Sequence, residues 1–357
     1  MNINFIIGTK AQFIKCIPVI NEAIKRSYSV CLYDLKQHAK TTNELKIKIE
    51  NAYSYVELSS NSKDLGSYSN LIKWFFINFI KFILFPTKNI RNEICIVHGD
   101  TLSTLLGVIK VKRSRGILTL LESGHKVPGI FSHFPESIIR YISAKLSDVL
   151  IVNGIDQINQ LKSWRVKGTI IEISQNTIYE SVIGEKLPER KDNNIVLVSI
   201  HRTENLNNKK NLGLLAQNLI SLSKKFIVIW CLHIPTKNKL IKYNFYEELV
   251  KNGVELKDLV PYNQFLTLIN NSEFVITDGG GVVEECRIIG TPTLVWREEH
   301  IDQNHLFDGD TNLILSYYNQ DSIEYFVQNY KKYRNPFQKR KSANPSSEVL
   351  DNLQSLI

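Results

Sequence analysis

The sequence lacks the cysteine patterns of several protein classes. Its cysteines are odd in number and widely spaced, and they form no C-x-x-C pair: Cys16, Cys31, Cys95, Cys231 and Cys286. We therefore expect no zinc or redox site of that type. The first ten residues have no basic segment, no full apolar segment and no small-residue cleavage site, so a signal peptide is not expected. A reduced, cytoplasmic compartment fits best.

Negative charge is also in short supply. Lys and Arg number 44 against 35 Asp and Glu, giving a net charge of +9. This balance favours anionic partners such as a nucleotide, a sugar phosphate, a membrane face or a nucleic acid. No RNA-binding or recognition-helix pattern stands out, so we expect no nucleic-acid partner. The sequence also shows no metal-ligand cluster and no cofactor motif, so neither a metal nor a cofactor is expected.

Short apolar runs alternate with amphipathic stretches along nearly the whole chain, which is typical of parallel α/β layers. Strands are expected at 4–7, 30–33, 93–97, 117–121, 148–152, 195–199, 226–231 and 274–277. The 357 residues suit about two domains, and the polar stretch 184–194 separates two groups of strands. We predict an α/β protein with two doubly wound, Rossmann-like domains at 1–180 and 181–339.

Residues 70–89 are unusually rich in aromatic and aliphatic side chains, but Lys73, Asn78 and Lys81 interrupt the run. The segment is too short and too interrupted to span a bilayer. We expect a helix buried in the core or in a dimer interface. The alternative is a helix lying on a membrane, assisted by the basic stretch 331–341.

Three carboxylates stand where a parallel sheet binds ligands. Asp100 and Glu122 each follow a predicted strand, and Glu136 stands in the first turn of a helix. Ligands of open α/β sheets bind beyond the carboxyl ends of the strands, so we expect the three acids to converge. The alternatives are a helix cap for Asp100 and a pair of Glu136 with Arg140 on one helix face.

Other motifs at strand ends suggest phosphate binding. They are Gly8-Thr9-Lys10 with Lys15, then His201-Arg202, His233, and the turn Asp278-Gly279-Gly280-Gly281. Glycine amides at a helix N-terminus can cradle a diphosphate. Glu285, expected in the first turn of that helix, would accept hydrogen bonds from ribose. The alternative is a glycine turn that only packs a helix against the sheet.

In order and spacing these motifs resemble those of the UDP-N-acetylglucosamine 2-epimerase family, of the non-hydrolysing type. They are GTKAQFIK, KQH, VHGDTLSTLLG, ESG, FPES-x-x-R, HRTEN, LH-x-P and TDGGG-x-x-EE. The resemblance implies the GT-B architecture, with a UDP-sugar in the cleft between the domains. It also implies a C-terminal helix, here 340–357, that completes the first domain, and a homodimer formed through that domain.

The resemblance further implies a set of site residues. Catalytic residues would be Asp100, Glu122, Glu136, Lys15 and His201. Residues that bind the nucleotide sugar would be Lys10, Gln37, Arg140, Arg202, His233, Gly279, Gly280, Gly281 and Glu285. The chain departs from the family's pattern at Lys10, Ala11-Gln12, His125-Lys126, Gly279 and Asp302, where the family usually has Arg, Pro-Glu, Leu-Arg, Ser and Arg.

The implied function is inversion of C2 of a UDP-HexNAc, for surface polysaccharide precursors. The C2 hydrogen is not beside a carbonyl, so the family's route removes this proton while UDP leaves C1, and UDP then returns. Clustered carboxylates would raise one another's pKa, so that one is charged and another neutral. Lys10, Lys15, His201, Arg202 and the glycine amides would stabilise the leaving diphosphate.

Three other functions are weighed against this one. A GT-B glycosyltransferase would pass the sugar to an acceptor, and Lys10, Gly279, Asp302 and the aromatic segment favour it. A hydrolysing 2-epimerase would release free sugar and UDP. A non-catalytic sensor of nucleotide sugars is disfavoured, because three aligned acids have little value in a binding module.

Overall fold

The computed structural model describes residues 1–50, 52–61, 65, 68–126, 135–191, 193–298, 311–337 and 344–356. The chain divides into two compact units, Met1–Ser181 with Lys341–Ile357, and Val182–Arg340. Asp302, one of the departures from the family's pattern, lies outside the described residues.

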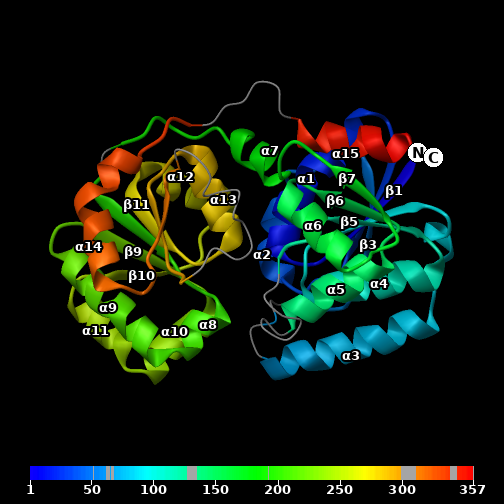
Figure 1. The fold of residues 1–357 in the computed structure, drawn as a ribbon. Coiled ribbons are helices and arrows are strands. Elements are labelled where there is room, and N and C mark those ends of the chain that lie inside the picture. The colour runs from blue at the N-terminus through cyan, green and yellow to red at the C-terminus, as the bar shows by residue number, and fades with distance from the viewer. Residues whose placement is uncertain are drawn as a thin grey trace. The chain divides into compact units, whose positions relative to one another are not determined.

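The first unit is a parallel sheet with helices on both faces (Figure 1). Its strands are β1 (Asn2–Ile7), β2 (Ser29–Asp34), β3 (Tyr53–Glu57), β4 (Ile94–His98), β5 (Ile117–Leu121), β6 (Val149–Val152) and β7 (Thr169–Glu172). Its helices are α1 (Lys10–Lys25), α2 (Ala39–Lys46), α3 (Tyr68–Leu84), η1 (Lys88–Ile90), α4 (Leu102–Ser114), α5 (Glu136–Leu146), α6 (Ile155–Ser163), α7 (Ile178–Ile183), in which the division falls, and α15 (Pro345–Gln354). The strand order is β3-β2-β1-β4-β5-β6-β7.

The second unit repeats this design. Its strands are β8 (Ile195–Ser199), β9 (Ile227–Leu232), β10 (Glu255–Asp258), β11 (Ser272–Thr277), β12 (Thr293–Val295) and β13 (Leu313–Leu315). Its helices are α8 (Thr203–Asn207), α9 (Lys209–Ser223), α10 (Ile234–Lys242), α11 (Phe245–Lys251), α12 (Tyr262–Asn271), α13 (Gly280–Ile289), α14 (Gln320–Asn329) and η3 (Tyr330–Tyr333). The order is β10-β9-β8-β11-β12-β13. In each sheet the order in which the strands are added reverses at one point, between β1 and β4 in the first unit and between β8 and β11 in the second. Such folds bind ligands at this point.

The predicted α/β class is confirmed, because each unit has a parallel, doubly wound sheet. Strands β5 and β8 begin and end where the sequence predicts, and the other predicted strands differ by one or two residues. The prediction missed β3, β7, β10, β12 and β13. Strands β3 and β10 are edge strands with mostly exposed side chains, so they lack the apolar run of a buried strand. Strands β12 and β13 have only three residues each.

Helix α15 belongs to the first unit although it lies at the far end of the chain. It packs against α1, where Arg26 Nη1 lies 2.5 Å from Asp351 Oδ1. The amide of Ser174 donates to Glu348 Oε2 at 2.6 Å. These polar contacts fasten the helix to α1 and to the loop after β7.

Helix α3 lies beside α4 at the outside of the first unit (Figure 1). Its inner face joins the core, because Trp74 and Phe82 are 6% and 0% exposed. Its outer face is exposed: Phe76 is 57% and Ile80 is 56% exposed. The expectation of burial in the core thus holds for one face of this helix only. No helix among the described residues is both long enough and apolar enough to cross a bilayer.

Candidate active site

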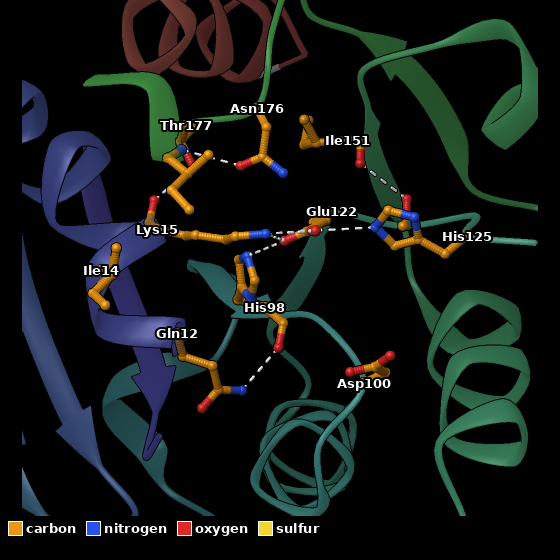
Figure 2. A network of polar contacts seen from close by, with 12 residues as sticks. Gln12, Ile14, Lys15, His98, Asp100, Glu122, His125, Ile151, Asn176 and Thr177 are labelled. Carbon is orange, nitrogen blue, oxygen red and sulfur yellow. Dashed lines mark hydrogen bonds and ion pairs between the residues drawn. The ribbon is translucent and has the colours of Figure 1, made fainter. Parts of the chain in front are cut away.

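Glu122 is surrounded by nitrogen atoms in a buried cluster of the first unit (Figure 2). Lys15 Nζ lies 2.7 Å from both carboxylate oxygens. His98 Nε2 lies 2.7 Å from Oε2, and His125 Nε2 lies 3.0 Å from Oε1. None of these four side chains is more than 11% exposed. Helix α1, strand β4 and the loop after β5 thus bring one carboxylate, one ammonium and two imidazoles together.

This arrangement decides the charge of Glu122. Burial by itself would raise the pKa of the carboxyl, but the charge of Lys15 and the hydrogen bonds of His125 and His98 outweigh burial and hold this pKa well below its usual range. Glu122 is therefore ionised at neutral pH. The expectation that clustered acids raise one another's pKa is wrong for Glu122, because a cation and two imidazoles surround it. Lys15 was expected to face a phosphate, whereas its ammonium contacts Glu122.

The backbone around Glu122 is unusual as well. Glu122 has a φ of 60° and Gly124 a φ of 77°, in the left-handed region where a non-glycine residue costs about 1–2 kcal/mol. A Cβ at Gly124 would lie 2.6 Å from the carbonyl oxygen of Gln157, so only glycine fits there. The side-chain amide nitrogen of Gln157, Nε2, lies 3.5 Å from His125 Nδ1. Because an amide nitrogen only donates, Nδ1 accepts and the proton on Nε2 faces Glu122.

Asp100 stands beside this cluster and is held by a different partner. Arg140 Nε donates to Asp100 Oδ2 at 2.6 Å. Helix α4 is capped by Thr101, whose hydroxyl accepts from the Thr104 amide, so the alternative role of Asp100 as a helix cap is excluded. Glu136 is the exposed first residue of α5. Arg140, on the same helix, turns its guanidinium to Asp100 and thereby links α5 to the end of β4.

Two glutamines brace the ends of the central strands. Gln12 is 1% exposed; its oxygen accepts from two amides at the end of β1, and its nitrogen donates to the His98 carbonyl at 2.8 Å. Gln37 accepts from the amide of Ser103 at 3.1 Å, so it supports the start of α4. Gln12 therefore fixes the backbone that carries His98. Lys10 is the first residue of α1, and its side chain is partly exposed.

Asp278 ties the ends of β8 and β11 together in the second unit. It is fully buried, and its carboxylate accepts from the amides of His201 and Arg202 at 3.0 and 2.9 Å. Asn205 Nδ2 donates to it at 2.8 Å. This places His201 and Arg202 at the point between β8 and β11 where the strand order of the second sheet reverses.

The two histidines of the second unit lie side by side. The His201 and His233 rings have centroids 4.7 Å apart. A Cβ added at Gly279 would lie 2.5 Å from His201 Cε1. The glycine that replaces the family's usual serine therefore leaves the space that the His201 ring fills.

The helix after the glycine turn begins earlier than expected. Gly279 is the N-cap of α13, and Gly280 and Gly281 are its first two residues. Glu285 consequently stands in the second turn, not in the first turn as predicted, and it is 5% exposed. Burial and the nearby charge of Glu285 raise the pKa of Tyr262 well above its usual value. The amides at the start of α13 still lack helix partners and suit an anion.

The predicted residues fall into the two units. The first unit holds Lys10, Lys15, Gln37, Asp100, Glu122, Glu136 and Arg140, and the second holds Arg202, His201, His233, Gly279, Gly280, Gly281 and Glu285. Sequence reasoning missed Gln12, His98 and His125 as members of the site, although Gln12 and His125 are departures from the family's pattern. Among the described residues, no group of three or more His, Cys, Asp and Glu side chains could hold a metal ion.

Two Rossmann-like units with charged side chains at the points where the strand order reverses are typical of α/β proteins that bind nucleotides. The sequence profile of the family described as UDP-N-acetylglucosamine 2-epimerase matches residues 36–348. The chain therefore belongs to the UDP-N-acetylglucosamine 2-epimerase family, whose members are nucleotide-sugar isomerases, and the resemblance seen in the sequence is confirmed.

Individual relatives agree with this assignment. The UDP-N-acetylglucosamine 2-epimerase of Methanocaldococcus jannaschii is 22% identical, over 98% of this chain and 99% of its own. A structure of the enzyme from that organism in complex with UDP-GlcNAc and UDP aligns over both whole chains, with a TM-score of 0.80 and 23% identity. A structure of the Neisseria meningitidis enzyme bound to UDP-GlcNAc aligns with a TM-score of 0.79 and 22% identity, over 99% of this chain and all of the Neisseria chain.

The calicheamicin glycosyltransferase CalG4 shares the fold more distantly. Its TM-score is 0.53 at 12% identity, over 99% of this chain and 97% of its own. Both kinds of enzyme are thus similar in fold to this chain, and the 2-epimerases are more similar.

Proposed function

We propose that this protein inverts C2 of a UDP-N-acetylhexosamine by eliminating and re-adding UDP. The observation that carries the proposal is the buried, ionised Glu122 at the carboxyl end of β5, held by Lys15, His98 and His125. A carboxylate with strained backbone geometry at the ligand edge of a parallel sheet is typical of a catalytic site. Family membership supports the same class of reaction.

In this mechanism the first unit handles the proton. Removal of the C2 proton needs a base, and reprotonation on the opposite face needs an acid. Glu122 stays ionised and keeps the Lys15 ammonium and His125 Nε2–H in place. We propose that Asp100 and Glu136, which are the less buried carboxylates, exchange the proton with C2. Arg140 orients Asp100, and Gln37 acts through the start of α4.

The second unit holds the leaving group. The amides at Gly280 and Gly281 point out of the start of α13 and suit the diphosphate. His201, Arg202 and His233 add positive or donor groups near that helix end. Lys10 remains a proposed residue for binding the nucleotide sugar. Glu285, in the second turn, is the proposed partner of the ribose. Charge that develops on UDP would thus meet donors that are already in place.

We further propose a homodimer in the cytoplasm that makes precursors of surface polysaccharide. All five cysteines are free thiols, which suits a reducing compartment. The homodimer rests on the resemblance to the family.

Deuterium exchange tests the proposed reaction. In deuterated water, UDP-N-acetylglucosamine should gain deuterium at C2, as measured by mass spectrometry and proton NMR. Asp100→Asn and Glu136→Gln should each slow this exchange about 10²- to 10⁴-fold, which is the usual contribution of a general acid or base. Asp156→Asn is the matched control, because it removes an exposed carboxylate from the first turn of α6.

The other functions give different results in the same experiment. Transfer of the sugar to an acceptor without C2 exchange would overturn the proposal in favour of a glycosyltransferase. Release of free sugar together with UDP would favour a hydrolysing enzyme, and binding of UDP without any turnover would favour a sensor. Equal rates for Asp156→Asn, Asp100→Asn and Glu136→Gln would remove the two acids from the mechanism.

Gly279→Ala should weaken binding of UDP about ten-fold. The added Cβ would displace the His201 ring, and loss of one charge-assisted contact costs about 1.5 kcal/mol, which is close to a factor of ten. Gly154→Ala in the first unit is the control, because nothing lies within 4 Å of its added Cβ and Gly154 is not one of the proposed binding residues. Binding is measured by calorimetry and by the shift of the melting temperature with UDP. Equal losses in the two variants would show that His201 is not the reason.

A further inference from the structure

We propose that His125 is a positioning residue, which locks Glu122 as the ionised counter-charge of Lys15 and closes its carboxylate to a substrate proton. This inference deepens the proposed function, and only its kinetic test rests on that function. The chain has histidine at this position, where the family usually has leucine. The role is therefore a feature of this chain, and it follows from the contacts of the two ring nitrogens.

Within the described residues, four nitrogen contacts fill the carboxylate of Glu122. An ionised carboxylate offers about four lone pairs, two on each oxygen, and it only accepts hydrogen bonds. Oε1 has Lys15 Nζ at 2.7 Å and His125 Nε2 at 3.0 Å. Oε2 has Lys15 Nζ at 2.7 Å and His98 Nε2 at 2.7 Å (Figure 2). His125 thus occupies the fourth site, which would otherwise be open to a proton taken from carbon.

The other side of the His125 ring fixes the position of its hydrogen. Gln157 Oε1 accepts from the backbone amide of Asn153 at 2.7 Å, so the oxygen is turned to the backbone and Nε2 to the ring. Nε2 of Gln157 lies 3.5 Å from His125 Nδ1, which therefore accepts. Gln157 and His125 are 4% and 9% exposed, so water competes little for either contact. The hydrogen on Nε2 of His125 consequently faces Glu122.

The backbone turn after β5 sets His125 against Glu122. Glu122 and Gly124 have φ angles of 60° and 77°. Between them, the amide and the hydroxyl of Ser123 both donate to the Ile151 carbonyl of β6, at 3.0 and 3.1 Å. The turn is therefore fastened to the sheet, and it brings His125 back onto the carboxylate three positions earlier. Strained backbone of this kind is typical of functional sites, and here it holds the imidazole on its partner.

The other titratable groups beside Glu122 are Lys15 and Cys16 on α1 and His98 on β4. Burial raises the pKa of the Glu122 carboxyl, whereas the charge of Lys15 and the hydrogen bonds of the two imidazoles lower it. Cys16 stays a neutral thiol, because burial and the charge of Glu122 raise its pKa. Loss of the His125 donor would leave burial opposed by two partners instead of three. The ionised form of Glu122 should then become less stable.

Nitrogen NMR of protein with labelled histidine tests the contacts of His125 in the wild type. At neutral pH the ring should carry hydrogen on Nε2 and none on Nδ1. The signal is assigned by its loss in His125→Asn. Hydrogen on Nδ1, or on both nitrogens, would overturn the proposal, because Gln157 could then not donate to the ring.

Two variants form a matched pair for the charge of Glu122. The amide nitrogen of glutamine reaches the place of imidazole Nε2, whereas that of asparagine reaches only the place of Nδ1. Carbon NMR of labelled glutamate follows the Glu122 carboxyl, whose signal is the one lost in Glu122→Gln. At the lowest pH at which all proteins stay folded, His125→Asn should raise the ratio of protonated to ionised Glu122 about ten- to a hundred-fold, the worth of one hydrogen bond to a charged group.

His125→Gln should raise this ratio much less, because it keeps a donor for Oε1. His125→Leu, which introduces the family's usual residue, should behave like His125→Asn and carries the test if the asparagine variant unfolds. Equal ratios in the glutamine variant and in the variants without a donor would overturn the proposal.

The kinetics of C2 exchange separate positioning from a purely structural role. His125 acts on the chemical step through Glu122 and Lys15, whereas the second unit is proposed to hold UDP. His125→Asn and His125→Leu should therefore lower kcat about ten-fold with little change in KM, and His125→Gln should recover most of the loss. Equal kcat in all three variants, or a change in KM alone, would contradict the role of His125. Absence of C2 exchange in the wild type would instead overturn the proposed function, and the two NMR results would still decide the role of His125.

Discussion

Glu122→Gln should lower the free energy of unfolding by about 3–5 kcal/mol and remove most C2 exchange. The amide keeps the shape of the side chain but not its charge, so the buried ammonium of Lys15 loses the carboxylate 2.7 Å away. Removal of one partner from a buried ion pair typically costs this much, because the remaining charge stays uncompensated. Urea unfolding and deuterium exchange measure the two effects.

The pH dependence of stability should change in the same variant. Because the folded-state pKa of Glu122 is lowered, its stabilising contribution is full above the unfolded value of about 4.3. That contribution is lost as pH falls from there through the lower folded pKa. Glu122→Gln should therefore lose less stability than the wild type over this acid range. Parallel acid-unfolding curves for the two proteins would contradict the assigned charge.

Two further variants separate the causes. Lys15→Met combined with Glu122→Gln removes both charges of the pair and should recover part of the lost stability, but not the C2 exchange. Glu57→Gln breaks the surface pair of Glu57 with Lys36, where Glu57 is 49% exposed, and should change stability by no more than about 1 kcal/mol. If the double variant were as unstable as the sum of the single variants, Lys15 and Glu122 would not be coupled.

Asp278→Ala should destabilise the second unit by about 3–5 kcal/mol and remove the response to UDP. Alanine leaves the amides of His201 and Arg202 and the side chain of Asn205 without their acceptor. Each buried donor without a partner costs about 1–3 kcal/mol. The loop after β8 would then no longer hold His201 and Arg202 at the start of α13. Thermal unfolding with and without UDP measures both effects.

The matched control is Asp258→Ala at the end of β10. Its side chain is 90% exposed, so removal should change stability by less than about 0.5 kcal/mol and leave the UDP response intact. Full UDP binding by Asp278→Ala would show that this carboxylate has a purely structural role. Equal stability of the two alanine variants would contradict the hydrogen-bond network described here.

Buried strands were predictable because their side chains form short apolar runs bounded by glycine and polar residues. Strands β5 and β8 follow this rule, and they end one and two residues before the predicted site residues Glu122 and His201. Edge strands escaped the prediction because pairing with one neighbour, rather than burial on both faces, holds them in place. The start of α13 was misplaced because glycine resembles a loop residue, although Gly280 and Gly281 are helical here.

The amino-acid sequence by itself determined the α/β class, the family and the positions of Asp100, Glu122 and Glu136 at the ends of elements. These follow from local periodicity and from the order of motifs, which need no knowledge of distant contacts. The tertiary structure alone decided which groups meet: Lys15 and His98 on Glu122, Arg140 on Asp100, and the His201 ring above Gly279. Pairing of this kind joins residues up to 107 positions apart. Charge and burial of a side chain depend on such neighbours, so the low pKa of Glu122 could only emerge once the chain had folded.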